Sequence, residues 1–371
     1  MMPGDDLCGG FPPGDQFAAL LAKEAREKAI PISGTFELTP RCNFNCKMCY
    51  VHLKEERIPQ FGRELTAEEW LRIAREAKEA GMLYLCITGG EPTLHPEFET
   101  IYRELAQMGF FITLQTNAST MKGKVLRLLE EYPPKLVKLT IYGSNDEMYR
   151  DVCEVEHGFA QVDAGIRALK QLEIPVLAVT TVIKNNKDDL ANIHRYTQEM
   201  GIPWIYSTAV HPSIRGAETD AAAVAIDEET ATDFRADVQW MIEHPWRKEG
   251  DKPCEHCKGY RNSFWITWDG KMRFCSFMDE PDIKLFTCTF KKNWQYLIDF
   301  EEKQEWPKAC NSCEIYAYCR LCPGALSSLS GSTKKVNKRF CSSLKRYIIE
   351  SEELKNGTES NICSRSGENS R

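Results

Sequence analysis

The chain has 371 residues, of which 42% are hydrophobic and 27% charged, a composition typical of a globular protein long enough for more than one domain. Its formal net charge of −7 leaves no basic excess to neutralise phosphates, which argues against a main role on nucleic acid or a membrane surface. The sequence contains no run of about 18 apolar residues, and its first thirty residues lack the basic start and apolar core of a signal peptide. We therefore expect a cytoplasmic protein.

Cysteine is the unusual component, with 16 residues in the chain. A secreted disulfide scaffold would be short and preceded by a signal, so metal ligation in a reducing compartment is the better interpretation. Three cysteines lie within 42–49, and nine lie between residues 254 and 341. This distribution predicts an N-terminal helical segment (1–32), a core domain (33–215), a helical bridge (216–250), a small cysteine-rich domain (251–345) and a disordered tail (346–371).

Predicted strands and amphipathic helices alternate along the core domain, after one N-terminal helix at Phe17–Ala29. Strands are expected at Thr35–Thr39, Leu83–Thr88, Phe111–Gln115, Lys135–Tyr142, Val176–Val182 and Trp204–Ser207. Helices are expected at Glu68–Ala80, Glu97–Met108, Lys122–Glu131, Phe159–Leu172 and Leu190–Met200. Six such units predict an α/β fold with a parallel sheet and right-handed crossovers, in which chemistry gathers at the carboxyl ends of the strands.

The first cysteine group directly follows the first predicted strand. Cys42, Cys46 and Cys49 have C-x3-C-x2-C spacing, so their thiolates can bind three irons of a [4Fe–4S] cube. The fourth iron then lacks a protein ligand, which is the arrangement of an open catalytic metal position. A zinc site, or a structural cluster with a distant fourth ligand, is the alternative.

Together with Gly89-Gly90-Glu91-Pro92 after the second strand, this triplet resembles the radical S-adenosylmethionine (SAM) superfamily. The resemblance implies a partial (β/α)6 barrel. It also implies that the open iron chelates SAM and that an electron breaks the S–C5′ bond, giving a 5′-deoxyadenosyl radical that takes hydrogen from a substrate. An external one-electron donor, such as a flavodoxin or ferredoxin, would supply that electron.

The resemblance also implies a SAM site on the loops after strands two to four. Gly89, Gly90 and Glu91 would contact the SAM amino group, through backbone carbonyls and the Glu91 carboxylate. Thr116-Asn117 and Ser144-Asn145 resemble positions that contact the SAM carboxylate or ribose hydroxyls, with simple turn formation as the alternative.

The C-terminal cysteines resemble the SPASM extension of this superfamily, which binds two auxiliary [4Fe–4S] clusters. The resemblance assigns cluster one to Cys254, Cys257, Cys275 and Cys322, and cluster two to Cys310, Cys313, Cys319 and Cys341. One departure is that two residues, where the family has three, separate the last two cysteines of the tight quartet. This spacing offers Cys288 as the alternative to Cys322. A separate alternative is that Cys254 does not ligate, which would leave an iron open for a substrate thiolate. Zinc ribbons are the alternative for the whole set.

Three other residues outside these motifs receive structural interpretations. Cys86 and Cys153 are expected to be buried thiols, and Arg215, beyond the sixth strand, is expected to be exposed, with contact to SAM or substrate as its alternative.

Three functions remain open at this point. The first is oxidative modification or crosslinking of a ribosomally made peptide, which SPASM-bearing relatives perform. The second is oxidation or rearrangement of a small metabolite such as a carbohydrate or alcohol, and the third is a non-catalytic iron–sulfur or zinc protein. Formylglycine-type activation of sulfatases is disfavoured, because Ser276 stands where those relatives carry an aspartate base. No catalytic base is predicted.

Overall fold

A computed structural model describes residues 16–227, 245–319, 321–338, 340–342, 344–346 and 348–349. The chain divides into two compact units, the first comprising Met1–Ile226 with Cys257–Lys303 and the second Asp227–His256 with Gln304–Arg371. Much of the predicted bridge and nearly all of the predicted tail lie outside the described residues. Among the residues described, no helix is both long and apolar enough to cross a lipid bilayer.

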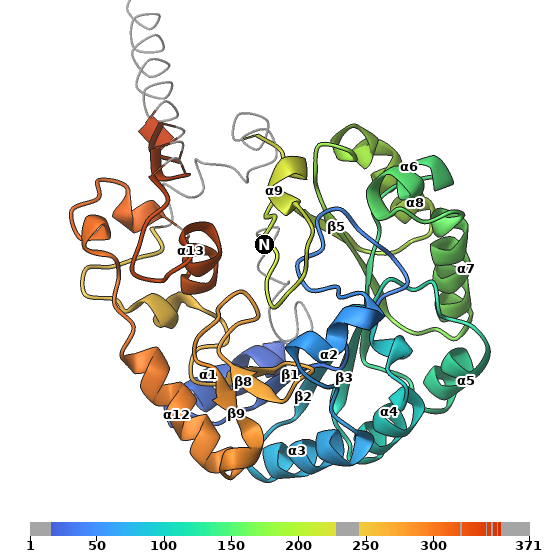
Figure 1. The fold of residues 1–371 in the computed structure, drawn as a ribbon, viewed down its shortest axis with the longest axis horizontal. Helices are drawn as coiled ribbons and strands as arrows, with labels where there is room; N and C mark the ends of the chain where they lie inside the picture. The colour runs from blue at the N-terminus through green and yellow to red at the C-terminus, as the bar shows by residue number, and fades with distance from the viewer. Residues whose placement is uncertain are drawn as a thin grey trace, which may run out of the picture. The chain divides into compact units, whose positions relative to one another are not determined.

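A nine-stranded sheet forms the centre of the first unit, in the order β6-β5-β4-β3-β2-β1-β7-β8-β9 (Figure 1). The strands are β1 Ser33–Glu37, β2 Tyr84–Thr88, β3 Phe111–Thr116, β4 Leu136–Thr140, β5 Val176–Thr181, β6 Trp204–Ser207, β7 Ser263–Ile266, β8 Lys271–Arg273 and β9 Ile283–Lys284. Strands β1 to β6 pair in parallel with their neighbours. This confirms the predicted α/β fold, with its six β/α units.

The sheet continues past β1 into the cysteine-rich part of the sequence. Strand β7 pairs in parallel with β1, and β8 and β9 follow as antiparallel strands. Helix α1 (Gln16–Lys28) attaches to this extension, because Arg26 donates to the carbonyl of Cys257 at 2.8 Å and Asn262 donates to that of Ala22 at 3.2 Å. The core sheet and the start of the extension are therefore one structure.

The crossover helices lie along the outer side of this sheet, as Figure 1 shows for α3, α4, α5 and α7. Helix α3 illustrates their origin: Thr66 and Glu69 form a capping box, and Trp70 and Ile73 lie on its buried face. The α-helices after α1 are α2 Ile58–Phe61, α3 Ala67–Glu79, α4 Phe98–Gln107, α5 Gly123–Glu131, α6 Asp146–Cys153, α7 Gly158–Gln171, α8 Leu190–Glu199, α9 Ala221–Val224, α12 Phe290–Glu302 and α13 Pro323–Ser330.

The second unit is described mainly by short turns of 3-10 helix and helix α13. A small apolar cluster of Ile315, Leu344 and Ile348 packs against the side chains of Cys313 and Cys319. The backbone N–H groups of residues 246 and 247 both donate to the carbonyl of Ala317, at 2.8 and 3.1 Å. The thiols of Cys313 and Cys319 therefore lie against the small apolar cluster of this unit.

Candidate active site

The loop that carries Cys42, Cys46 and Cys49 is fixed at its backbone by helix α6. The N–H groups of Asn45 and Lys47 donate to the carbonyls of Cys153 and Val152, at 2.9 and 3.0 Å. Lys47 also pairs with Asp151 at 2.7 Å. The C-terminal turn of α6 and the loop after β1 are thereby held together at the carboxyl ends of the strands, where the sequence predicts chemistry.

The three thiols lie close enough to one another to interact electrostatically. Burial raises the pKa of Cys42, and the neighbouring thiols of Cys46 and Cys49 raise it further. Burial and Cys46 likewise raise the pKa of Cys49, to about 11. Thiolates that repel one another in a buried site are stabilised by cationic iron, so this donor set fits a cluster with three cysteine ligands.

Several hydrogen-bond donors point at these sulfurs. The N–H of Phe44 and the side-chain amide of Asn117 donate to the Cys42 sulfur at 3.4 and 3.9 Å, and the N–H of His52 donates to that of Cys49 at 3.4 Å. Donors of this kind stabilise a thiolate and tune the metal that it binds.

The Gly-Gly-Glu segment packs directly against the cysteine loop. The N–H groups of Gly90 and Glu91 donate to the carbonyls of Thr39 and Arg41, at 2.8 and 2.7 Å. A Cβ on Gly89 would lie 2.5 Å from the Thr39 oxygen, and one on Gly90 would lie 2.3 Å from the Arg41 oxygen. Any side chain at these two positions would therefore push the loops after β1 and β2 apart.

Glu91 is fully buried and joins the loops after β2 and β3 through its carboxylate. It accepts hydrogen bonds from the hydroxyls of Thr93 (2.6 Å) and Thr116 (2.8 and 2.9 Å) and from the N–H of Asn117 (2.8 Å). Burial raises its pKa, and these donors oppose the rise. The structure thus places Glu91, Thr116 and Asn117 in one network beside Cys42, whereas their contact with SAM stays a prediction.

Ser144 and Asn145 have local partners at the end of β4. Ser144 donates from its N–H and its hydroxyl to the two carboxylate oxygens of Asp189, at 2.7 and 2.8 Å. The side chain of Asn145 caps helix α6 by accepting from the N–H of Met148 at 2.9 Å. These local contacts are of the kind expected if both residues serve turn formation, and their contact with SAM stays a prediction here too.

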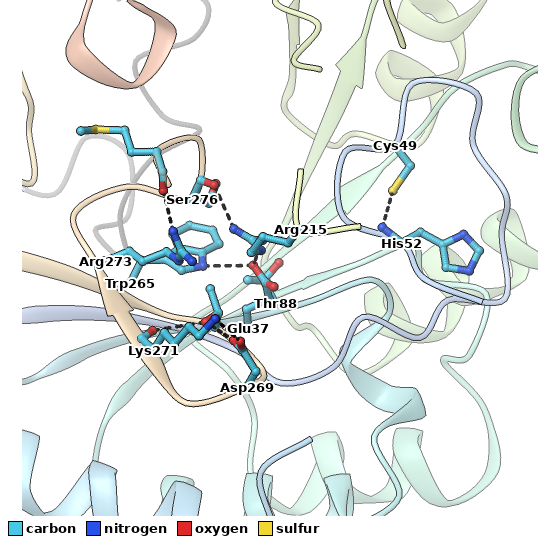
Figure 2. Close-up of polar contacts among 12 residues, drawn as sticks. Glu37, Cys49, His52, Thr88, Arg215, Trp265, Asp269, Lys271, Arg273 and Ser276 are labelled. Carbon is cyan, nitrogen blue, oxygen red and sulfur yellow. Dashed lines mark hydrogen bonds and ion pairs between the residues drawn. The ribbon is translucent and has the colours of Figure 1, made fainter. Parts of the chain in front are cut away.

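A buried ion pair that the sequence did not indicate lies at the carboxyl end of β1 (Figure 2). Glu37 accepts from Arg215 at 2.7 Å and from the indole N–H of Trp265 at 3.1 Å, and Arg215 also donates to the carbonyl of Ser276 at 3.0 Å. Burial raises the pKa of Glu37, and Arg215 opposes the rise. The cluster joins β1, the segment after β6 and the extension.

The expectation that Arg215 is exposed is therefore wrong, since its side chain is only 9% exposed. The ion pair with Glu37 is the physical reason, because it lets the guanidinium be buried. The one feature of the sequence that could have indicated this ion pair is Glu37, an acidic residue at the carboxyl end of β1, where chemistry gathers in such folds.

In the second unit, the thiols of Cys310, Cys313, Cys319 and Cys341 line a single pocket, together with Arg247 and Trp306. These are the four cysteines assigned to auxiliary cluster two. Among the described residues, no three His, Cys, Asp or Glu side chains converge closely enough to hold one metal ion. Four thiols around a pocket fit a polynuclear cluster in donor chemistry, and that they bind one stays a prediction.

The other assigned cysteines are distributed over both units. Cys257 and Cys275 belong to the first unit, and Cys254 and Cys322 to the second. The Cys322 sulfur caps helix α13 by accepting from the N–H of Ala325 at 3.4 Å, and it does not line the four-thiol pocket. Their ligation of auxiliary cluster one stays a prediction.

The remaining described cysteines lie outside these sets. Cys86 is buried in β2, and Cys153 is buried beside the Cys46 thiol, whose pKa it raises. Cys288 directly precedes the cap of helix α12. Cys8 and Cys363 lie outside the described residues.

Comparison with known proteins agrees with this geometry. Residues 36–197 match the family model of the Radical SAM superfamily. The AdoMet-dependent heme synthase of Methanosarcina barkeri is 22% identical over 330 residues, covering 80% of this chain and 92% of that protein. The antilisterial bacteriocin subtilosin biosynthesis protein AlbA of Bacillus subtilis is 27% identical over 350 residues, covering 88% of this chain and 74% of that protein.

A solved structure with a similar fold is Streptococcus suis SuiB bound to S-adenosylmethionine. It superposes with a TM-score of 0.62 at 15% identity, covering 88% of this chain and 79% of that one. The same protein has been solved with its precursor peptide SuiA.

Proposed function

We propose that this chain, whose residues 36–197 match the Radical SAM superfamily, is a radical SAM enzyme that oxidatively modifies or crosslinks a ribosomally made peptide. The observation that supports a peptide substrate is the similarity to AlbA, a bacteriocin biosynthesis protein, over 88% of the chain. That length includes the cysteine-rich part as well as the barrel. The fold likeness to SuiB, which has been solved with a precursor peptide, supports the same substrate class.

Cys42, Cys46 and Cys49 would hold the [4Fe–4S] cluster, and the loops after β2, β3 and β4 would hold SAM. When bound, the cluster and SAM supply a 5′-deoxyadenosyl radical that abstracts hydrogen from the substrate. The chain's own part is positional, because the contacts with α6 and with Thr39 and Arg41 fix the loops that present these groups. The SAM contacts proposed are Gly89, Gly90, Glu91, Thr116, Asn117, Ser144 and Asn145.

We assign the extension's thiols to two auxiliary [4Fe–4S] clusters with the ligand sets given above. A modification that oxidises its substrate leaves one electron to be removed from the product radical, and buried clusters can accept or relay it. With four cysteines each, neither cluster has an iron left for the substrate, so the proposed role is electron transfer. An external flavodoxin- or ferredoxin-like protein would reduce the SAM cluster.

The test is anaerobic incubation of the iron-loaded protein with reductant, SAM and candidate precursor peptides. We expect 5′-deoxyadenosine to form and one peptide to lose mass in steps of about two hydrogens, as mass spectrometry would show. Cleavage of SAM without modification of any peptide, but with turnover of a porphyrin or other small molecule, would contradict the peptide assignment. The similarity to a heme synthase, which covers 80% of the chain, is the reason to test small molecules in parallel.

A further inference from the structure

One arginine of the second unit faces the four-thiol pocket. Arg247 lines the pocket with Cys310, Cys313, Cys319 and Cys341, and it is only 3% exposed. Its guanidinium carbon lies 3.7 Å from the centroid of the Trp306 ring and 5.4 Å from that of Tyr316. Two aromatic faces therefore fix this cation within the wall of the pocket.

The cation has little local compensation. The hydrogen bond shown for its side chain goes to the neutral carbonyl of Leu321, and its Nε has no hydrogen-bond partner among the residues described. A buried positive charge is costly unless a negative charge faces it. The groups that could supply that charge here are the four thiols, which line the same pocket as Arg247.

We propose that Arg247 is the countercharge of the auxiliary cluster in this pocket and raises its reduction potential. The inference rests on the proposed function, because it takes the four thiols to hold a [4Fe–4S] cube. A cube with four thiolates is anionic and gains one further negative charge when it accepts an electron. A fixed cation beside it stabilises the reduced form more than the oxidised form.

Arginine suits this position better than lysine would. Its guanidinium is weakly hydrated, stacks on aromatic rings and stays protonated, so the charge persists in a buried pocket. The cluster would thereby be poised to take the electron that substrate oxidation releases. The fixed arginine would supply the positive charge, so no cation from solvent would be required.

The experiment is a redox titration of the full-length, iron-loaded chain, followed by magnetic resonance of the reduced cluster. The background carries Cys42→Ala, Cys46→Ala and Cys49→Ala, so that the SAM cluster gives no signal. The signal of interest is the one that disappears on adding Cys310→Ala. In Arg247→Met we expect the ratio of reduced to oxidised cluster at a fixed potential to fall about tenfold, which is 59 mV for one electron.

Lys345→Met is the matched control. Lys345 lies near Cys341 and Cys313, but it is 37% exposed and pairs with Glu314 at 2.9 Å. Solvent and that partner screen its charge, so its loss should shift the potential clearly less. Arg247→Lys, which keeps a positive charge, should stay closer to the parent than Arg247→Met does.

The outcomes separate the two proposals. If the parent shows no signal that depends on Cys310, the cluster assignment itself is wrong. If the signal is present but Arg247→Met leaves its potential unchanged, or shifts it no more than Lys345→Met does, the countercharge role is wrong. Should Arg247→Met fail to load iron, loading by Arg247→Lys supports the charge, whereas failure of both shows that Arg247 serves packing alone.

Discussion

The two cysteine sites of this chain are held in place by different means. The loop of Cys42, Cys46 and Cys49 is tied by backbone hydrogen bonds to α6 and to the Gly-Gly-Glu segment. The four-thiol pocket is instead lined by sulfur, aromatic rings and one cation, among short turns. We therefore expect the first site to be shaped by the sheet before any cluster binds, and the second to depend on its proposed cluster for much of its structure. Such a difference would suit one site that orients SAM and another that is proposed to transfer an electron.

The sharpest way to separate the sites is to remove the first set of thiols. The triple variant Cys42→Ala, Cys46→Ala, Cys49→Ala should lose all formation of 5′-deoxyadenosine, because no cluster remains to bind SAM. The iron content should fall from roughly twelve to roughly eight atoms per chain, since each cube holds four. Cys86→Ala, which removes a buried thiol from β2, is the control and should keep SAM cleavage. Residual cleavage by the triple variant would refute the assignment.

Removal of iron and sulfide tests which site is preformed. In the apo protein we expect backbone amide exchange to increase strongly over 310–319 and to change little over 42–49. The reason is that the second site loses its cross-links, whereas the hydrogen bonds from Asn45 and Lys47 to α6 remain. Hydrogen exchange with mass spectrometry measures both segments in one sample. Equal loss of protection in the two would show that the first loop also needs its cluster to fold.

Breaking the Glu37–Arg215 pair should destabilise the first unit strongly. Arg215→Leu leaves a buried carboxylate without its partner, which costs about 3–5 kcal/mol in the free energy of unfolding. The double variant Glu37→Leu with Arg215→Leu should be less destabilised than the sum of the two single changes. Chemical denaturation of the four proteins gives the coupling energy. An additive result would mean that the pair contributes nothing to joining β1 to the extension.

A smaller effect is expected at the contact between the loops after β1 and β2. Gly90→Ala should cost about 1–3 kcal/mol, because its Cβ would lie 2.3 Å from the Arg41 oxygen, and it should also reduce SAM cleavage. Gly109→Ala is the control, since its Cβ would meet nothing within 4 Å at a φ of +80°. It should lose only the backbone contribution of about 1–2 kcal/mol and keep SAM cleavage. Equal cleavage by both variants would contradict a positioning role for the Gly-Gly-Glu segment.

The elements that the sequence predicted are those with a strong local pattern. Buried parallel strands such as β2 were found because each is a short apolar run, and helix α3 was found because Trp70 and Ile73 recur on one face. Strands β8 and β9 have only three and two residues, too few for a period, and β7 forms against a partner that is distant in the sequence. Their place in the sheet could not be read from local sequence.

The same distinction applies to the candidate site. Cysteine spacing and the Gly-Gly-Glu segment are local motifs, so the residues on the first loops could be named. Glu37 and Arg215 are 178 positions apart in the sequence. Arg247 lines a pocket whose other lining residues lie between 306 and 344. Charges that matter only through a tertiary partner carry no pattern of their own in the sequence.

The pairing of β1 with β7 has a consequence for synthesis of the chain. Ser33 pairs with Ser263, so the outer edge of β1 stays uncovered until 230 further residues have been made. At about 5–20 residues per second this lasts roughly 10 to 50 seconds, during which the backbone N–H and C=O groups on this edge of β1 are open to association with other chains. We therefore expect the nascent barrel to need a chaperone until β7 emerges to pair with β1.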